Sequence, residues 1–263
     1  MNKIVVILQK EWLELRQQRG LLLGVILPPL LLTVLPLVTA YGLGHTASIA
    51  GSRGQLPPGI NNPAFVGLTQ PEVGQVIVGQ QFSILLLLLP MIIPSVIAAY
   101  SIVGEKTNRT LEPLLATPIR SWELLLGKSL ASLIPAIGIT WLCGAVFAAG
   151  LASVAINARV FTTVVSPGWV LVLMLCTPLL ALIAVAAMVA ISSRVNDPRT
   201  AQQLSGVGVV PILLVFFGQI TGWLVLRPAL VLGAVVVLGL LAVLAMWGAA
   251  RLFQREVILT RWK

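Results

Sequence analysis

Residues 73–104 read VGQVIVGQQFSILLLLLPMIIPSVIAAYSIVG and contain no charged side chain. A helix needs about 20 apolar residues to cross the hydrocarbon core of a bilayer, so this run is long enough to span a membrane. The segment 84–89 is continuously apolar, whereas strands of transmembrane barrels alternate apolar and polar residues. The run therefore predicts a transmembrane helix.

Five further intervals lack Asp, Glu, Lys and Arg in the same way, and each is long enough for one more helix. Only 10% of the chain is charged and 58% is hydrophobic, with a mean hydropathy of +1.01. Soluble domains contain about 25% charged residues, so a soluble enzyme and a disordered chain are both excluded. We expect residues 1–263 to form a single all-α transmembrane domain with spans at about 21–43, 79–103, 124–151, 168–192, 204–226 and 229–250.

The basic residues predict how the chain is oriented. Fourteen of the 17 Lys and Arg residues lie in segments 1–20, 104–128, 193–203 and 251–263, and the opposite loops hold only Arg53, Arg159 and Arg227. Because cytoplasmic loops are enriched in Lys and Arg, we expect a multi-pass protein of the inner (plasma) membrane with both termini cytoplasmic. The net charge of +9 lies in small groups at helix ends, where it meets lipid headgroups. We therefore expect contact with membrane lipid and no nucleic-acid partner.

Two segments outside the spans have helical patterns. In residues 3–19, Val5, Leu8, Trp12 and Leu15 recur at spacings of three and four, which predicts an amphipathic helix in the membrane interface. The alternative is a plain cytoplasmic extension of the first span. In the loop 104–128, three leucines at helical spacing predict a short amphipathic helix that packs on the membrane surface or on another protein: Leu111, Leu114 and Leu115.

The chain offers no recognisable chemistry of its own. Gly127-Lys128-Ser129 resembles the end of a phosphate-binding loop, but the full pattern needs a glycine where Trp122 stands. We interpret Lys128 as an interfacial anchor whose ammonium snorkels to the headgroups. The only histidine, His45, has no nearby carboxylate or cysteine in the sequence. We predict no catalytic, cofactor or metal residues, and since no charge lies deep in a span, a proton-driven carrier is disfavoured.

Residues 104–131 resemble the signature between spans 2 and 3 of the ABC-2 type transporter permeases. In that family a Glu, a Thr-Leu-Glu, a small residue before Pro, and a Gly-Lys recur in this order. The matching positions here are Glu105, Thr110-Leu111-Glu112, Thr117-Pro118 and Gly127-Lys128.

The resemblance implies a permease subunit of a bacterial exporter. Such a subunit pairs with a second copy and is driven by a separate cytoplasmic ATPase, which holds the ATP and Mg. The segment 107–118 would be the coupling helix that enters a groove of the ATPase. The expected coupling residues are Glu105, Thr110, Leu111, Glu112, Leu114, Leu115, Thr117 and Pro118.

Six helices enclose little more than their own side chains, so a path for cargo is more easily formed between two copies. Small residues four apart allow helices to approach closely. They mark possible dimer faces on spans 1 and 5: Gly20 and Gly24, and Gly218 and Gly222. The apolar spans favour a drug, lipid or other amphiphile as cargo over a metal ion. The alternative function is a non-transporting membrane scaffold that recruits a protein through the same cytoplasmic loop.

Overall fold

The computed structural model describes residues 3–50, 67–105, 121–192, 195, 197–220 and 228–252. Within these ranges every regular element is a helix. Six helical stretches are long and apolar enough to cross a membrane: Arg19–His45, Gln70–Ser101, Glu123–Val154, Ala158–Ser192, Pro198–Gln219 and Leu230–Ala249. The prediction of an all-α protein with six spans is therefore confirmed.

Several spans consist of more than one helical element. The first is α2 (Arg19–Ala50), which follows the N-terminal helix α1 (Lys3–Gln17). The third is a single helix, α7 (Ser121–Val154), and so is the sixth, α13 (Pro228–Leu252). The second span consists of α3 (Gln70–Leu85), η2 (Leu86–Leu88), α4 (Leu89–Ala98) and η3 (Ala99–Gly104). The fourth span consists of α8 (Ala158–Val164), α9 (Pro167–Leu171), η4 (Val172–Cys176) and α10 (Thr177–Ser192). The fifth span consists of α11 (Pro198–Ser205), η5 (Gly206–Val209) and α12 (Val210–Ile220).

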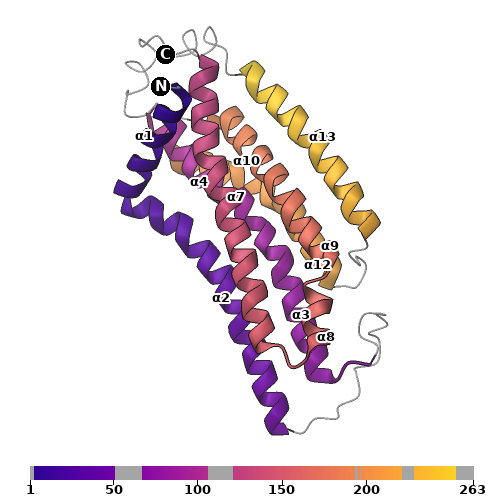
Figure 1. The fold of residues 1–263 in the computed structure, drawn as a ribbon. Helices are drawn as coiled ribbons and strands as arrows, with labels where there is room; N and C mark the ends of the chain where they lie inside the picture. The colour runs from indigo at the N-terminus through magenta and orange to yellow at the C-terminus, as the bar shows by residue number, and fades with distance from the viewer. Residues whose placement is uncertain are drawn as a thin grey trace.

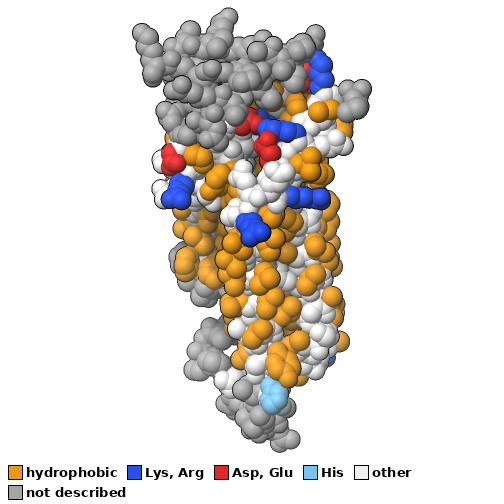
Figure 2. Space-filling model, turned by 90° about the vertical axis from the view of Figure 1, so that its left-hand side faces the viewer, with side chains coloured by type: hydrophobic (Ala, Val, Ile, Leu, Met, Phe, Trp, Pro, Cys, Tyr) orange, Lys and Arg blue, Asp and Glu red, His pale blue; other side chains and the backbone are white. Residues whose placement is uncertain are grey.

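The helices form an elongated bundle (Figure 1). Helices α1 and α2 lie on one side and α13 packs along α10 on the other. The start of α1 and the end of α13 lie toward the same end of the bundle. We call this the charged end, because α1, Glu105 and Lys128 lie there, and we call the end where α2 finishes and α3 begins the opposite end. On the face shown in Figure 2, hydrophobic side chains cover most of the length and charged side chains gather mainly toward the charged end.

The second span is the centre of the bundle. In α4 nine of ten residues are buried, and 72% of the residues are buried in an 18-residue apolar stretch of the second span. In the corresponding stretches of the fifth and sixth spans, only 17% and 11% of the residues are buried. A helix that is apolar on all sides is stable only inside a protein or in lipid, so α4 is a protein core helix and α13 presents most of its surface outward.

Proline explains where the second span changes geometry. Pro90 has no N–H to donate to the Leu86 carbonyl, the partner that a regular α-helix would give it. The Leu89 N–H donates to that carbonyl instead, which produces the 3₁₀ turn η2. The first span holds Pro28, Pro29 and Pro36 and still forms one helix.

Candidate functional site

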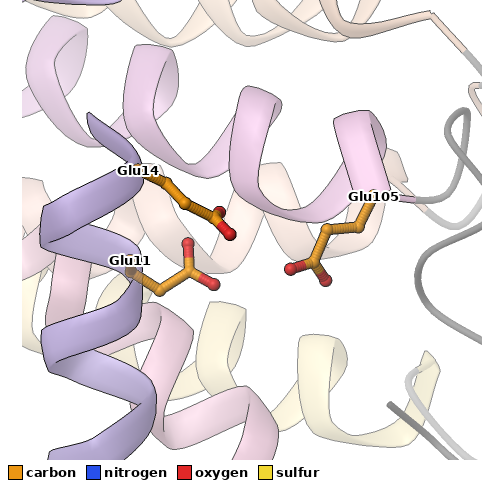
Figure 3. A group of neighbouring side chains, drawn as sticks. All are labelled: Glu11, Glu14 and Glu105. Atoms are coloured by element: carbon orange, nitrogen blue, oxygen red, sulfur yellow. The ribbon is translucent and has the colours of Figure 1, made fainter. Parts of the chain in front are cut away.

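A cluster of charged side chains lies at the charged end, where α1, the end of the second span and the start of α7 meet. Glu11 and Glu14 project from α1 and Glu105 projects from the end of the second span, and their carboxylates face one another (Figure 3). Lys10 of α1 and Lys128 of α7 form ion pairs with these carboxylates. We call these five residues the ion-pair network.

Lys128 joins the three elements of the network. Its Nζ lies 2.7 Å from Glu11 Oε1 and 2.8 Å from Glu105 Oε2, and its side chain is 2% exposed. The same ammonium donates to the carbonyl and the hydroxyl of Ser101, both at 3.0 Å. The expectation that Lys128 snorkels toward the headgroups is therefore wrong, because α1 covers this face of α7 and supplies the carboxylate that pairs the charge.

Lys10 contacts all three carboxylates. It donates to Glu105 and forms ion pairs with Glu14 at 3.0 Å and Glu11 at 3.5 Å. Burial disfavours the charged form of Lys10, but the hydrogen bond to Glu105 and the charge of Glu11 outweigh burial and raise the pKa of Lys10. Burial likewise disfavours the Glu11 carboxylate, but the charge and hydrogen bond of Lys128 outweigh it and lower the pKa of Glu11.

Close packing brings the charges together. At Gly127, an added Cβ would lie 2.8 Å from Ile7 Cγ2, so only glycine lets α1 approach α7 this closely. The Trp12 indole N–H donates to the Ala131 carbonyl at 3.1 Å and anchors the other side of the contact. On α1, Ile7 and Glu11 are buried, whereas Val5 and Trp12 of the predicted apolar stripe are 48% and 37% exposed.

The three carboxylates are grouped as in a metal site, since one oxygen from each lies within 4.8 Å of the others. Two ammonium groups already lie among them, however, and neutralise most of their charge. The internal ion pairs are a sufficient reason for three carboxylates to lie this close together, because each negative charge has a positive partner.

A second polar network lies at the opposite end. The Gln75 amide N–H groups donate to the Ala40 carbonyl of α2 at 2.7 Å and the Val154 carbonyl of α7 at 3.2 Å. The Ile156 N–H donates back to Gln75 Oε1 at 3.0 Å. Glu72 accepts from Asn157 Nδ2 at 2.6 Å and from the Thr69 N–H at 2.7 Å. This network fastens α2, α3 and α7 together around Gln75, which is completely buried.

Most of the predicted coupling residues lie outside the described residues. Glu105 is described and is buried in the ion-pair network. The others fall in residues 106–120 and are not described: Thr110, Leu111, Glu112, Leu114, Leu115, Thr117 and Pro118. Their assignment stays a prediction.

The predicted dimer faces are described in part. A Cβ at Gly20 would meet open space, and one at Gly24 would lie 3.6 Å from Val96 Cγ1 of the same chain. Gly218 belongs to α12, and Gly222 lies outside the described residues. The dimer faces also remain predictions.

Sequence reasoning missed Lys10, Glu11 and Lys128 as parts of one site. One signal was present: Glu11 follows Ile4 and Ile7 on the same helical face, where an acidic residue interrupts a set of apolar residues. A charge in that position indicates a partner on the element that covers the face. The sequence did not show that this element is α7.

Comparison with family models gives one match, to the family described as ABC-2 family transporter protein, over residues 5–231. The match includes α1, both sides of the ion-pair network and the first five spans. No curated protein matches the chain.

Proposed function

This chain belongs to the ABC-2 family of transporter proteins and is a membrane permease component, and from this premise we propose that it works as one half of an exporter driven by a separate ATPase. In this proposal the charged end is cytoplasmic and the membrane is the inner (plasma) membrane. The chain supplies the substrate path and the partner supplies ATP hydrolysis with Mg. The cargo is an amphiphile, such as a drug or a lipid.

The observation that carries the proposal is the position of the ion-pair network relative to residues 106–120. Glu105 directly precedes this segment, and Glu123 and Lys128 follow it on α7. Lys128 forms one ion pair with Glu105 and another with Glu11 of α1. A movement of the segment 106–120 would therefore be transmitted to α1 and to the second and third spans together.

The uneven burial of the spans supports a pair of subunits. In an 18-residue apolar stretch of the second span 72% of the residues are buried, whereas the corresponding shares in the first, fifth and sixth spans are 28%, 17% and 11%. Leu214 and Phe217 of α12 are 66% and 59% exposed. We propose that a second copy covers part of this surface on spans 1 and 5 and that the cargo path forms between the copies.

Substitution of the leucines in the segment 106–120 tests the proposal. Leu114→Asp together with Leu115→Asp places charge in the expected apolar contact with the ATPase, at a cost of several kcal/mol if that contact is buried. We expect the variant to insert normally, to lose ATPase co-purification and to lose transport. Measurements are membrane insertion, ATPase retained on the purified permease, and substrate-stimulated ATP turnover.

The matched control is Leu230→Asp, which places the same charge on α13, where Leu230 is 53% exposed and away from the loop. It should lower insertion or stability and leave ATPase binding per inserted permease unchanged. Wild-type binding and transport in the doubly substituted loop variant would refute the coupling role. Recruitment of a protein without nucleotide turnover would favour the non-transporting scaffold instead.

A further inference from the structure

A groove lies between α1 and α7, beside the ion-pair network. Its volume is about 410 Å³. The α7 wall includes Ile134, Gly138 and Leu142, and the α1 wall includes Trp12 and Arg16. The Trp12 indole N–H is already bonded to the Ala131 carbonyl. Arg16 therefore supplies the charged group of an otherwise apolar lining.

The α7 wall suits a hydrocarbon chain. Ile134, Gly138 and Leu142 are spaced by four residues, so they form a stripe about 12 Å long down one face of the helix. Ile134 and Leu142 are 44% and 64% exposed. Apart from the adjoining backbone of α7, no atom of the described residues lies within 4 Å of the position that a Cβ at Gly138 would take. The stripe runs away from the charged end toward the middle of the span.

Arg16 differs from the lysines near it. Lys3, Lys10 and Lys128 each lie within 4.0 Å of a carboxylate oxygen, whereas no carboxylate of the described residues lies that close to Arg16. The planar guanidinium of arginine matches the oxygens of a phosphate in a two-point contact. The groove thus combines a cation that lacks such a carboxylate with an apolar wall that leads away from it.

We propose that this groove binds one anionic phospholipid, with its phosphate on Arg16 and an acyl chain along Ile134, Gly138 and Leu142. The positive charge of Arg16 favours an anionic headgroup, and the open space at Gly138 leaves room for the acyl chain. The proposal requires that the protein lies in a membrane. It does not depend on the ATPase, the dimer or the direction of transport.

Trp12 provides a fluorescent reporter inside the groove. The permease is reconstituted in vesicles that contain brominated phosphatidylglycerol or brominated phosphatidylcholine over the same series of mole fractions. The contribution of Trp12 is the difference in emission between the wild type and Trp12→Phe. One basic residue near the membrane surface contributes about 1 kcal/mol toward an anionic lipid. We therefore expect quenching of Trp12 to require about fivefold less phosphatidylglycerol than phosphatidylcholine.

Two variants with matched controls separate the parts of the site. Arg16→Gln should abolish the preference for phosphatidylglycerol, whereas Arg199→Gln, which removes an exposed arginine from α11, should preserve it. Gly138→Leu fills the groove and should reduce quenching by both lipids. Gly239→Leu adds the same side chain on α13, where the glycine also has no neighbour within 4 Å, and should not reduce it.

Equal quenching by the two lipids in the wild type, or an unchanged preference in Arg16→Gln, would overturn the proposal in favour of non-selective surrounding lipid. A loss of dimer in Gly138→Leu with the lipid preference intact would overturn it in favour of a second copy in the groove.

Discussion

The two polar networks at the ends of the bundle hold the helices together in different ways. The opposite end uses the neutral Gln75 amide against backbone carbonyls of α2 and α7. The charged end uses Lys128 against the carboxylates of Glu11 and Glu105. A buried amide that loses a partner loses a hydrogen bond, whereas a buried ion pair that loses a partner leaves an uncompensated charge.

This difference has a functional consequence. The Gln75 amide carries no charge, so its hydrogen bonds do not depend on the charge of a neighbouring side chain. The ion-pair network depends on charge balance, and its Glu105 directly precedes in sequence the segment 106–120, to which we assign the ATPase contact. In the proposed function, the charged end is therefore the part of the bundle whose packing the ATPase would change.

The largest effect is expected from Lys128→Met. Removal of the ammonium deprives the buried Glu11 of its nearest cation and the buried Glu105 of one of its two cations. Breaking a buried pair in this way costs about 3–5 kcal/mol. The free energy of unfolding of the purified permease measures this loss. Lys3→Met is the control, because the Lys3 side chain is 50% exposed and lies 3.7 Å from Glu123, and an exposed pair contributes at most about 1 kcal/mol. Equal effects of the two substitutions would contradict the role of Lys128 at the centre of the network.

Gly127→Ala should have the next largest effect. The added methyl group meets Ile7 and forces α1 away from α7, and overpacking of this kind costs about 1–3 kcal/mol. Ile7→Ala removes the opposing side chain, so the double variant should recover part of the stability lost in Gly127→Ala. Additive losses in a double-mutant cycle would show that the two residues do not meet.

Gln75→Leu probes the opposite end. It removes the donors to Ala40 and Val154 and the acceptor for Ile156, and buried groups left unpaired cost about 1–3 kcal/mol. The control is Gln81→Leu on the same helix, because Gln81 Oε1 is buried and has no hydrogen-bond partner among the described residues. We expect Gln81→Leu to be neutral or stabilising in the same unfolding assay. Greater destabilisation by Gln81→Leu than by Gln75→Leu would contradict the fastening role of Gln75.

Acidification should produce the smallest effect. The pKa of Glu11 is lowered from its ordinary value of 4.5, so its contribution to stability is present above pH 4.5 and is lost as the pH falls through the lowered pKa. The melting temperature of the wild type should fall over this range more steeply than that of Glu11→Gln. A Gln75→Leu permease should keep the steep wild-type dependence, since Gln75 is uncharged and lies at the opposite end of the bundle from Glu11. Parallel curves for the wild type and Glu11→Gln would exclude this contribution of Glu11.

The sequence by itself determined the fold class and the six spans. A helix that contains an apolar run such as 84–89 is stable only in lipid or in a protein interior. The charged residues on either side of such runs mark where each span ends. The second span was predicted to begin at about residue 79, but α3 begins at Gln70. Hydropathy alone did not predict this earlier start of α3. Its N-terminal turn is polar and is held by local contacts, among them the Glu72 carboxylate that accepts from the Thr69 N–H.

The tertiary structure alone decided which charges meet. In sequence, Glu11 and Lys128 are 117 residues apart, and Lys128 taken alone has an ordinary interpretation as an interfacial residue near the start of a span. They pair because α1 folds back onto α7 at Gly127, where the absence of a side chain allows close approach. Hydropathy depends on each residue alone and can be read along the chain, whereas an ion pair depends on the distance between two side chains, which only the packing of the helices sets.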